Sequence, residues 1–165
     1  IHRAILGSVE RMFAILTEHF AGKWPFWISP RQVMLVPISE ASRGYALEVR
    51  KKLHSAGFHA QVDETDRKMQ KKVREAQLEQ WNYILVVGVG EQTNGTVNIR
   101  TRDNVVHGEH ALIDLMAVLE TERKTKSLTC MFGVEKSAAA AAAREAEEVL
   151  AKAALDAAAA AAAQE

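Results

Sequence analysis

Three short strand-like segments separated by two amphipathic ones constrain the fold of this chain more than any other feature. The strand-like segments are residues 33–38, 58–63 and 83–88, of which the first and last are apolar runs, and residues 39–56 and 67–80 between them carry apolar side chains at helical spacing. Continuous apolar runs are typical of strands buried on both faces, and strands that alternate with helices over short connections form parallel sheets with right-handed crossovers. The sequence therefore predicts an α/β fold built on a parallel sheet.

The stretch 83–103 adds a strand of a different kind. Gly88, Gly90 and the Asn94–Gly95 pair predict a turn, on which Glu91 lies. Residues 96–102 then alternate between the two faces of a sheet, most simply as an antiparallel neighbour. One face carries Val97, Ile99 and Thr101, and the other carries Asn98, Arg100 and Arg102. A short edge strand is expected at 105–110, followed by a helix at 112–126 whose inward residues are Ile113, Met116 and Leu119.

The two ends of the chain differ from this central region. Residues 1–22 predict a helix that Ser8 can cap, with a buried stripe of Val9, Met12, Phe13, Leu16 and Phe20. Residues 23–30, KWPFWISP, predict a connector whose aromatic side chains pack against the next domain, the alternative being that Trp24 or Trp27 stacks on RNA bases. Residues 128–165 are a linker and a low-complexity tail, in which the alanine-rich part after Ser137 predicts a helix.

Composition narrows the function without deciding it. Lysine plus arginine and aspartate plus glutamate balance at 21 each, so a nucleic-acid surface would have to be local. The single cysteine, Cys130, excludes an internal disulfide, and no apolar run is long enough to cross a bilayer. The histidines show no spacing typical of a zinc site. Gly88-Val89-Gly90 is not expected to be a dinucleotide loop, because a turn and a strand are predicted to follow it instead of a helix.

The charged residues around stretch 83–103 suggest an anionic ligand, and RNA is the first candidate. Arginine side chains can contact phosphates and base edges, and Lys68, Lys71 and Lys72 on the preceding helix add further cations. Glu91 would repel phosphate, but one carboxylate can accept both N1–H and N2–H of a guanine. The alternative is a solvated charged face on which Glu91 pairs with a neighbouring arginine. The residues alone leave both interpretations open.

Four sequence blocks resemble one family. HRAILGSVER at 2–11 resembles the third signature motif of class II aminoacyl-tRNA synthetases in its threonyl form, and GKWPFWISPRQV, KKVREAQL and GTVNIRTRDN resemble the carboxy-terminal part of eukaryotic-type threonyl-tRNA synthetases. The resemblance runs from His2 to about Lys126. It implies that residues 1–22 are a remnant of a catalytic domain, 23–30 a connector and 31–127 an anticodon-binding domain, a three-layer α/β/α sandwich on a five-stranded mixed sheet with one antiparallel strand.

The resemblance also implies roles for individual residues. In the family a glutamate after the third domain strand reads the G of the threonine anticodon, and an arginine on the following strand contacts the U; the matching residues here are Glu91 and Arg100. Asn98 and Arg102 share the face of Arg100. Asp66 stands where the family has an asparagine, and since aspartate cannot donate as asparagine does, that contact is in doubt. Lys68, Lys71 and Lys72 are expected to contact the tRNA backbone.

Three residues near the start match the family's catalytic site. Arg11 corresponds to the arginine that grips the ATP phosphates, Ser8 lies by the threonine pocket, and His2 corresponds to one of three zinc ligands. The remaining ligands and motifs are missing here, so this chain alone is expected to hold no cofactor and neither to activate threonine nor to charge tRNA. The parent enzyme would use zinc, and ATP with magnesium.

The expected partner is the anticodon stem-loop of threonine tRNA, in the cytosol and without a membrane. The chain is expected to be monomeric, whereas the parent enzyme would be a homodimer. Two other functions are left open by the residues. One is a stand-alone interaction module that uses the same fold to contact protein or RNA, and the other is a small-molecule-binding α/β domain.

Overall fold

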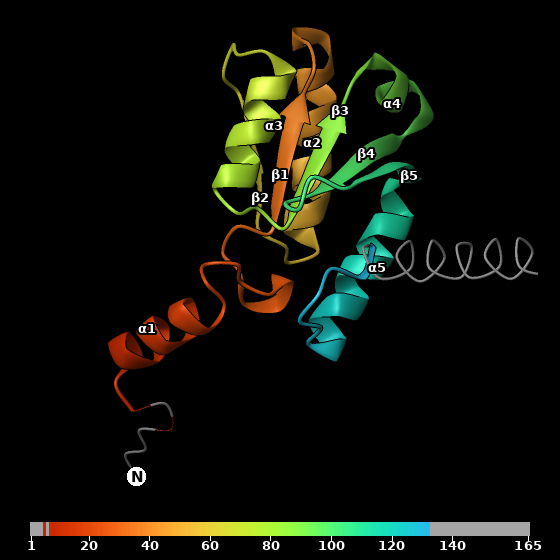
Figure 1. The fold of residues 1–165 in the computed structure, drawn as a ribbon. Coiled ribbons are helices and arrows are strands. Elements are labelled where there is room, and N and C mark those ends of the chain that lie inside the picture. The colour runs from red at the N-terminus through yellow and green to blue at the C-terminus, as the bar shows by residue number, and fades with distance from the viewer. Residues whose placement is uncertain (1–4, 6, 133–165) are drawn as a thin grey trace, which may run out of the picture. The chain divides into compact units, whose positions relative to one another are not determined.

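Five strands form one mixed sheet, in the spatial order β2-β1-β3-β4-β5 (Figure 1). The structure, a computed structural model, describes residue 5 and residues 7–132. The strands are β1 Val33–Pro37, β2 Ala60–Val62, β3 Tyr83–Val87, β4 Thr96–Thr101 and β5 Val106–Ala111. β1 runs parallel to β2 and β3, and β4 is antiparallel to both of its neighbours. The prediction of a five-stranded mixed sheet with one antiparallel strand is therefore confirmed.

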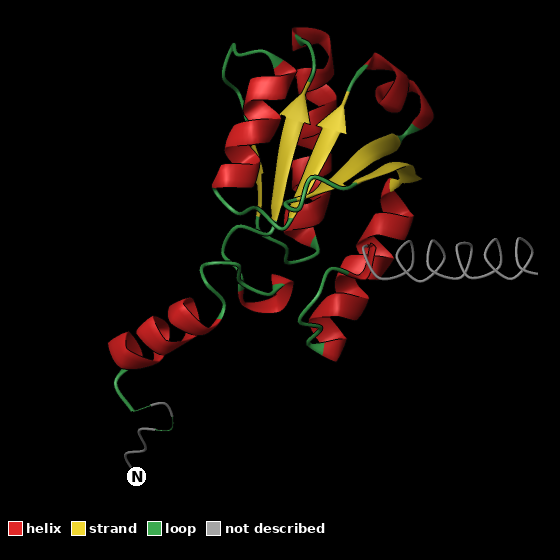
Figure 2. Cartoon of the chain, viewed as in Figure 1, coloured by secondary structure: helices red, strands yellow, loops and turns green. Residues whose placement is uncertain are grey.

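The helices lie on both sides of this sheet (Figure 2). Their bounds are α1 Val9–His19, α2 Arg43–Ser55, α3 Met69–Leu78, α4 Val89–Asn94 and α5 Leu112–Thr125, with short 3₁₀ turns at Phe26–Ile28 and Glu40–Ser42. α2 connects β1 to β2 outward along the sheet, whereas α3 connects β2 to β3 across β1. Two right-handed crossovers in opposite directions put their helices on opposite faces. This gives the predicted three-layer α/β/α arrangement.

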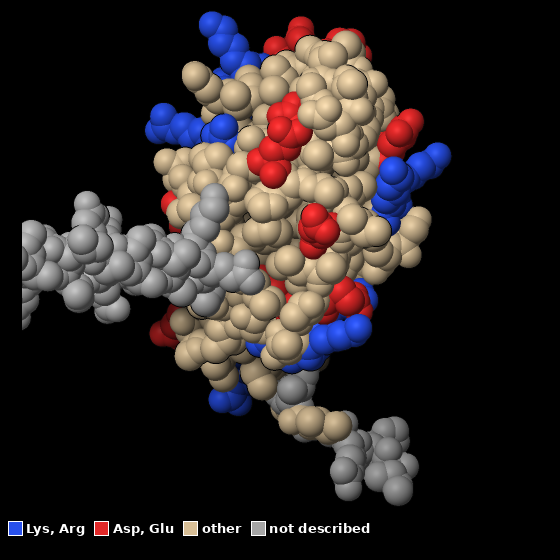
Figure 3. All heavy atoms as spheres, turned by 90° about the vertical axis from the view of Figure 1, so that its right-hand side faces the viewer, with Lys and Arg blue, Asp and Glu red and all other residues tan. Residues whose placement is uncertain are grey.

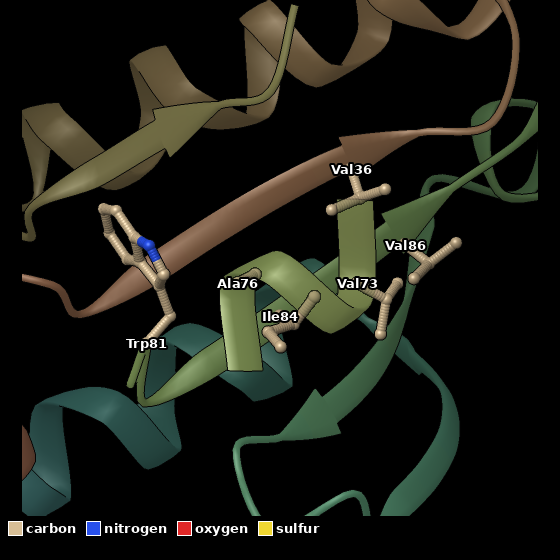
Figure 4. Close-up of a cluster of buried hydrophobic side chains, with 6 residues drawn as sticks. All are labelled: Val36, Val73, Ala76, Trp81, Ile84 and Val86. Atoms are coloured by element: carbon tan, nitrogen blue, oxygen red, sulfur yellow. The ribbon is translucent and has the colours of Figure 1, made fainter. Parts of the chain in front are cut away.

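The strand register explains which side chains each helix covers. On one face, Val36 of β1 and Ile84 and Val86 of β3 pack with Val73 and Ala76 of α3 and with Trp81 (Figure 4). On the opposite face, Tyr83 of β3 contacts the ring of Phe26 and donates a hydrogen bond to Glu122 of α5 at 2.5 Å. All five residues of β3 are buried, as a continuous apolar run predicts.

Two helices differ from expectation in extent or orientation. α3 is shorter than the predicted 67–80, because Lys68 has an extended backbone and forms the N-cap. In α5 the prediction that Ile113 faces inward is wrong, since its side chain is 77% exposed. Leu112, Leu115, Leu119 and Glu122 face inward instead. The helix is held in this orientation by the hydrogen bond from Tyr83 to Glu122, a polar contact that an apolar pattern does not reveal.

The predicted buried stripe of α1 is also wrong. None of its residues is buried, and Val9 and Phe13 are 70% and 63% exposed. Phe13 stacks on Trp24 with ring centroids 5.4 Å apart, and Phe20 lies 6.3 Å from the same ring. The apolar face of α1 lines an open hollow of about 430 Å³ together with the connector. The periodicity correctly identified a helix with one apolar face, but the described residues do not cover that face.

The chain divides into two compact units, Ile1–Met131 and Phe132–Glu165. The sheet, its helices and the connector belong to the first unit. The predicted alanine-rich helix and its cap Ser137 lie outside the described residues, as does His2. No helix in the described part is both long enough and apolar enough to span a membrane.

Candidate nucleic-acid interface

The parallel strands create a natural binding edge where β1 and β3 end. The segments that follow these two neighbouring strands lead to opposite sides of the sheet, because α2 and α3 cover opposite faces. In open α/β sheets, ligands bind at such a switch point, outside the carboxyl ends of the strands. Ile38 follows β1 and its N–H donates to the carbonyl of Val87 at 2.9 Å, which holds the two strand ends together. Glu91 and Asp66 both follow strands at this edge.

Glu91 is held in place by a short helix. The sequence predicts a turn here, whereas residues Val89–Asn94 form α4, which ends at Gly95 in the left-handed conformation with φ of +68°. The Glu91 Oε2 accepts a hydrogen bond from the Gly88 N–H at 2.9 Å, as a glutamate at the third position of a helix can. Within the part of the chain that the structure describes, no arginine forms an ion pair with Glu91. The alternative interpretation, in which an arginine neutralises it, is therefore not what the structure contains.

Gly88 lets this carboxylate approach the backbone closely. A β-carbon at this position would lie 2.9 Å from Glu91 Oε2 and 3.0 Å from Ile38 Cδ1. The helix that begins at Val89 also corrects the reason for excluding a dinucleotide loop. A helix does start directly after Gly88 and includes Gly90, but it has six residues and a carboxylate in its first turn, where a bound pyrophosphate would be repelled.

Tyr45 of α2 supports this region from the opposite face of the sheet. Its hydroxyl donates to the carbonyl of Thr96 at 2.9 Å, at the point where β4 begins. Burial, and then the carboxylates of Glu48 and Glu91, raise the pKa of Tyr45, so the phenol stays protonated and able to donate at neutral pH. Tyr45 belongs to the apolar face that the spacing in residues 39–56 predicts, and no spacing signal in the sequence links it to Glu91.

Asn98 and Arg100 lie on the face of β4 that continues from this edge. They pair with Val86 and Ile84 of β3, whose side chains face α3. α3 covers the β1 and β3 part of this face, and β4 lies beyond it. Asn98 Oδ1 and Arg100 Nε are buried and have no hydrogen-bond partner among the described residues. Unsatisfied buried polar atoms are rare in folded proteins, so this pair is suited to receive a ligand.

Arg102 lies at the other end of β4 and has a different role. Its guanidinium donates to the carbonyl of Trp24 at 2.9 Å, and Asn82 donates to the same oxygen at 3.0 Å. Both bonds attach the connector to the sheet at the amino ends of the parallel strands, away from Glu91. Trp24 stacks on Phe13, and the Lys126 ammonium lies 5.1 Å from the centre of the Trp27 ring. The packing interpretation of the connector aromatics therefore fits the structure better than RNA stacking.

The three lysines of the preceding helix separate into two groups. Lys68 and Lys71 are exposed, as a phosphate contact requires. Lys72 is only 6% exposed, and its Nζ donates to the carbonyl of Asp63 at 3.3 Å. The assignment of Lys72 to an outer surface is therefore corrected. Asp66 is exposed and has no hydrogen-bond partner among the described residues, and it lines a small polar hollow together with Lys72.

The remaining predicted site residues lie on or before α1. Ser8 caps the helix, accepting from the Arg11 N–H at 3.5 Å, and its hydroxyl donates to Glu10, which lowers the pKa of that carboxyl. Arg11 is exposed. The described residues contain no group of three or more histidine, cysteine, aspartate or glutamate side chains that could hold a metal.

Figure 3 shows the β5 side of the sheet, which is a different face from the edge where β1 and β3 end. On the part of it that the described residues form, acidic residues are separated from one another on a largely uncharged surface, and basic residues lie toward its margin. This agrees with the balanced charge of the chain.

A comparison with protein families identifies the central region. The family described as "Anticodon binding domain" matches residues 32–122, which include all five strands and the helices α2 to α5 up to Glu122. The chain belongs to this family. In this anticodon-binding domain, Glu91, Asn98 and Arg100 all lie within the matched residues.

The chain is also similar to threonine–tRNA ligases. "Threonine--tRNA ligase, mitochondrial 1" of Arabidopsis thaliana is 61% identical over 116 residues, which cover 70% of this chain and 16% of that protein. "Threonine--tRNA ligase 1, cytoplasmic" of Homo sapiens is 54% identical over 128 residues, which cover 77% of this chain and 18% of that protein. The resemblance to threonyl-tRNA synthetases is thus confirmed, and the anticodon-binding domain and its flanking residues span about a sixth of these relatives.

A solved structure agrees with the fold. The RNA binding domain of threonyl-tRNA synthetase from Cryptosporidium parvum Iowa II is 40% identical, with a TM-score of 0.67. The match covers 78% of this chain and 31% of that one. The α/β sandwich of this anticodon-binding domain is therefore the fold of a known threonyl-tRNA synthetase domain.

Proposed function

We propose that this domain recognises the anticodon of threonine tRNA by contacts to base edges, as one part of a threonine–tRNA ligase. The observation that carries the proposal is the Glu91 carboxylate, which is fixed by the Gly88 N–H at the switch point of the sheet and forms no ion pair with any cation of the described residues. A carboxylate at an RNA-binding edge is unfavourable next to phosphate but complementary to the N1–H and N2–H of guanine. Family membership and the threonine–tRNA ligase relatives support the same function.

The other groups of the edge would then contact the neighbouring base and the backbone. Arg100 has an unfilled donor at Nε and lies on the same face as Asn98, so these side chains can bind the oxygen and N–H atoms of a uracil. Lys68 and Lys71 are the exposed cations on α3 that would contact phosphates. Asp66 can accept from a base N–H, but it cannot donate as an asparagine would.

For the parent protein we propose the ATP-dependent attachment of threonine to tRNA, with zinc and magnesium held outside this domain, by a homodimer. The chain described here would bind tRNA without charging it, as a monomer. A cytosolic location is proposed by analogy with the cytoplasmic relatives, although a mitochondrial relative also matches. The family match does not favour a stand-alone interaction module or a small-molecule-binding domain.

Binding of the chain to two synthetic RNAs tests this function. One is the anticodon stem-loop of threonine tRNA, and the other replaces the central G of the anticodon by A, which lacks N1–H and N2–H. We expect weak, salt-dependent binding and a loss of about 1–3 kcal/mol on replacement, the scale of one good base contact. Glu91→Gln should remove most of this difference.

Equal binding of both RNAs by the unmodified chain would exclude Glu91 as the guanine reader. No binding to either RNA at any salt concentration, together with binding to a protein partner, would favour the interaction module instead. A control stem-loop with a changed stem sequence and an unchanged anticodon should bind as well as the original.

A further inference from the structure

A second group of polar residues follows β1 and β2, and of its members the function proposed so far uses only Asp66. It surrounds a hollow of about 90 Å³ at the carboxyl ends of β1 and β2. Ser39 and Arg43 line it after β1, Asp63 and Asp66 after β2, and Lys72 from α3. Small-molecule sites usually measure 300–1,000 Å³, so this hollow can admit the edge of a ligand but not a whole one.

Lys72 is the unusual member of this group. Lys72 exposes only 6% of its surface, and among the described residues its Nζ has one hydrogen-bond partner, the neutral carbonyl of Asp63 at 3.3 Å. An ammonium has three N–H donors, and a buried charge is unfavourable unless it is paired. Lysine often buries its stem and leaves its ammonium end in water, whereas Lys72 exposes only 6% of its surface and lines the hollow.

The other cations at the hollow are already neutralised. Arg43 donates to Glu40 at 3.1 Å and to Glu64 at 2.6 Å, and Arg67 forms an ion pair with Glu75. Among the described residues, Lys72 forms no ion pair with a carboxylate. Lys72 is therefore the cation at this hollow whose charge no carboxylate of the described residues neutralises.

The surrounding carboxylates decide which kind of ligand atom that is. Asp63 accepts from the Thr65 N–H at 2.9 Å and from its hydroxyl at 2.5 Å, whereas Asp66 has no hydrogen-bond partner in the described part of the chain. Two carboxylates beside one free ammonium would repel a phosphate. A neutral group that presents a carbonyl oxygen next to an N–H satisfies both Lys72 and Asp66. In RNA, guanine and uracil have this arrangement, and adenine and cytosine do not.

We propose that Lys72 is a specificity-determining residue that donates to the carbonyl oxygen of a guanine or uracil whose edge enters this hollow, while Asp66 accepts the adjacent N–H. This inference rests on the proposed function and adds a base contact separate from that of Glu91. It also gives a reason for a buried lysine on a helix whose other lysines, Lys68 and Lys71, are exposed.

The test measures base preference and not affinity alone. The chain is titrated with stem-loops in which each anticodon-loop U is replaced by C and each G by A, one position at a time. At one position other than the one that depends on Glu91, the unmodified chain should prefer the carbonyl-bearing base by about 5- to 100-fold. Lys72→Met, which keeps the length and removes the charge, should abolish that preference and leave the Glu91-dependent one unchanged.

Lys71→Met is the matched control, because it removes the same charge from an exposed neighbouring position. It should weaken binding to all the RNAs by a similar factor and leave every preference intact. If Lys72→Met does not fold, the ¹⁵Nζ signal of Lys72 in the unmodified chain provides a second measurement. It should shift with the carbonyl-bearing RNA and not with its replacement.

The outcomes separate this inference from the function on which it rests. RNA binding with a preference only at the Glu91-dependent position would overturn the role of Lys72 and leave anticodon recognition intact. An unchanged preference profile in Lys72→Met, or an unchanged Nζ signal, would do the same. A failure of the unmodified chain to bind any stem-loop would overturn the proposed function itself.

Discussion

Gly88→Ala is the substitution that most directly tests how the Glu91 carboxylate is positioned. The backbone of Gly88, with φ of −121° and ψ of −167°, is extended and open to alanine, so the change introduces no backbone strain. The new methyl group would lie 2.9 Å from Glu91 Oε2 and 3.0 Å from Ile38 Cδ1. Both neighbouring atoms are at the ends of flexible side chains and can move. The carboxylate is therefore displaced while the fold survives.

Two opposing contributions set the effect on stability. Alanine reduces the conformational freedom of the unfolded chain, which stabilises the fold by about 0.4–1 kcal/mol. Loss of the hydrogen bond from the Gly88 N–H to a charged acceptor costs about 1.5 kcal/mol, the lower end of the range for such bonds, because Glu91 is half-exposed. The net change in the free energy of unfolding should be a destabilisation of about 1 kcal/mol or less. Urea denaturation followed by tryptophan fluorescence measures it.

The effect on RNA recognition should be larger than the effect on stability. A displaced carboxylate loses its alignment with guanine, so the preference for G over A should fall by about 1–3 kcal/mol. Gly90→Ala is the control, because a β-carbon there meets no atom within 4 Å and lies within helix α4. It should leave the preference unchanged and stabilise the helix by about 0.5–1 kcal/mol. An unchanged G preference in Gly88→Ala would refute the claim that this carboxylate position reads the base.

Two further predictions concern stability. Burial raises the pKa of Glu122 above 4.5, although the hydrogen bonds from Tyr83 and Met131 lower it. The folded protein therefore binds this proton more tightly than the unfolded chain does, and the resulting stabilisation is lost as the pH rises through the folded pKa. In urea titrations the stability of the unmodified chain relative to Glu122→Gln should be lower at pH 7.5 than at pH 4.5, and a pH-independent difference would contradict this. Arg102→Met removes the hydrogen bond to the Trp24 carbonyl and should lower the free energy of unfolding by about 1.5 kcal/mol. Arg100 has no hydrogen-bond partner among the described residues, so Arg100→Met should change the free energy of unfolding by less than about 0.5 kcal/mol. Equal effects of the two substitutions would show that Arg102 does not attach the connector.

The parts of the fold that depend on short-range patterns were predictable from the sequence. The apolar run 83–88 is a buried strand, and the alternation in 96–102 places Val97 and Ile99 inside and Arg100 on the opposite face. The parallel pairing of β1 with β2 and β3 followed from the alternation of strands and helices, and the antiparallel pairing of β3 with β4 followed from the short chain reversal between them. These features depend on periods of two and of 3.6 residues, which the sequence displays directly.

The parts that depend on individual polar contacts were not predictable in the same way. α4 has six residues, ends at Asn94 and is flanked by Gly88 and Gly95, so its composition favours a turn. The hydrogen bond from the Gly88 N–H to Glu91 stabilises the first turn of the helix. Lys72 was predicted to contact the tRNA backbone because lysine is charged. In the structure it is buried, and its Nζ donates to the carbonyl of Asp63, which follows β2. The α1 stripe indicated an apolar face but not what covers it.

A carboxylate at the centre of an RNA-binding edge separates specificity from affinity. Phosphate contacts supply much of the affinity for RNA, and the exposed cations on α3 suited to them are few, among them Lys68 and Lys71. In the function proposed above, Glu91 would lower that affinity for any RNA whose base does not donate to it, because the carboxylate would lose water without gaining a partner. A mismatched base is therefore penalised twice, by the contact that is missing and by the charge left unpaired. This is how a chain with balanced charge can discriminate between anticodons that differ by one base, and it requires that most of the affinity come from contacts elsewhere on the tRNA.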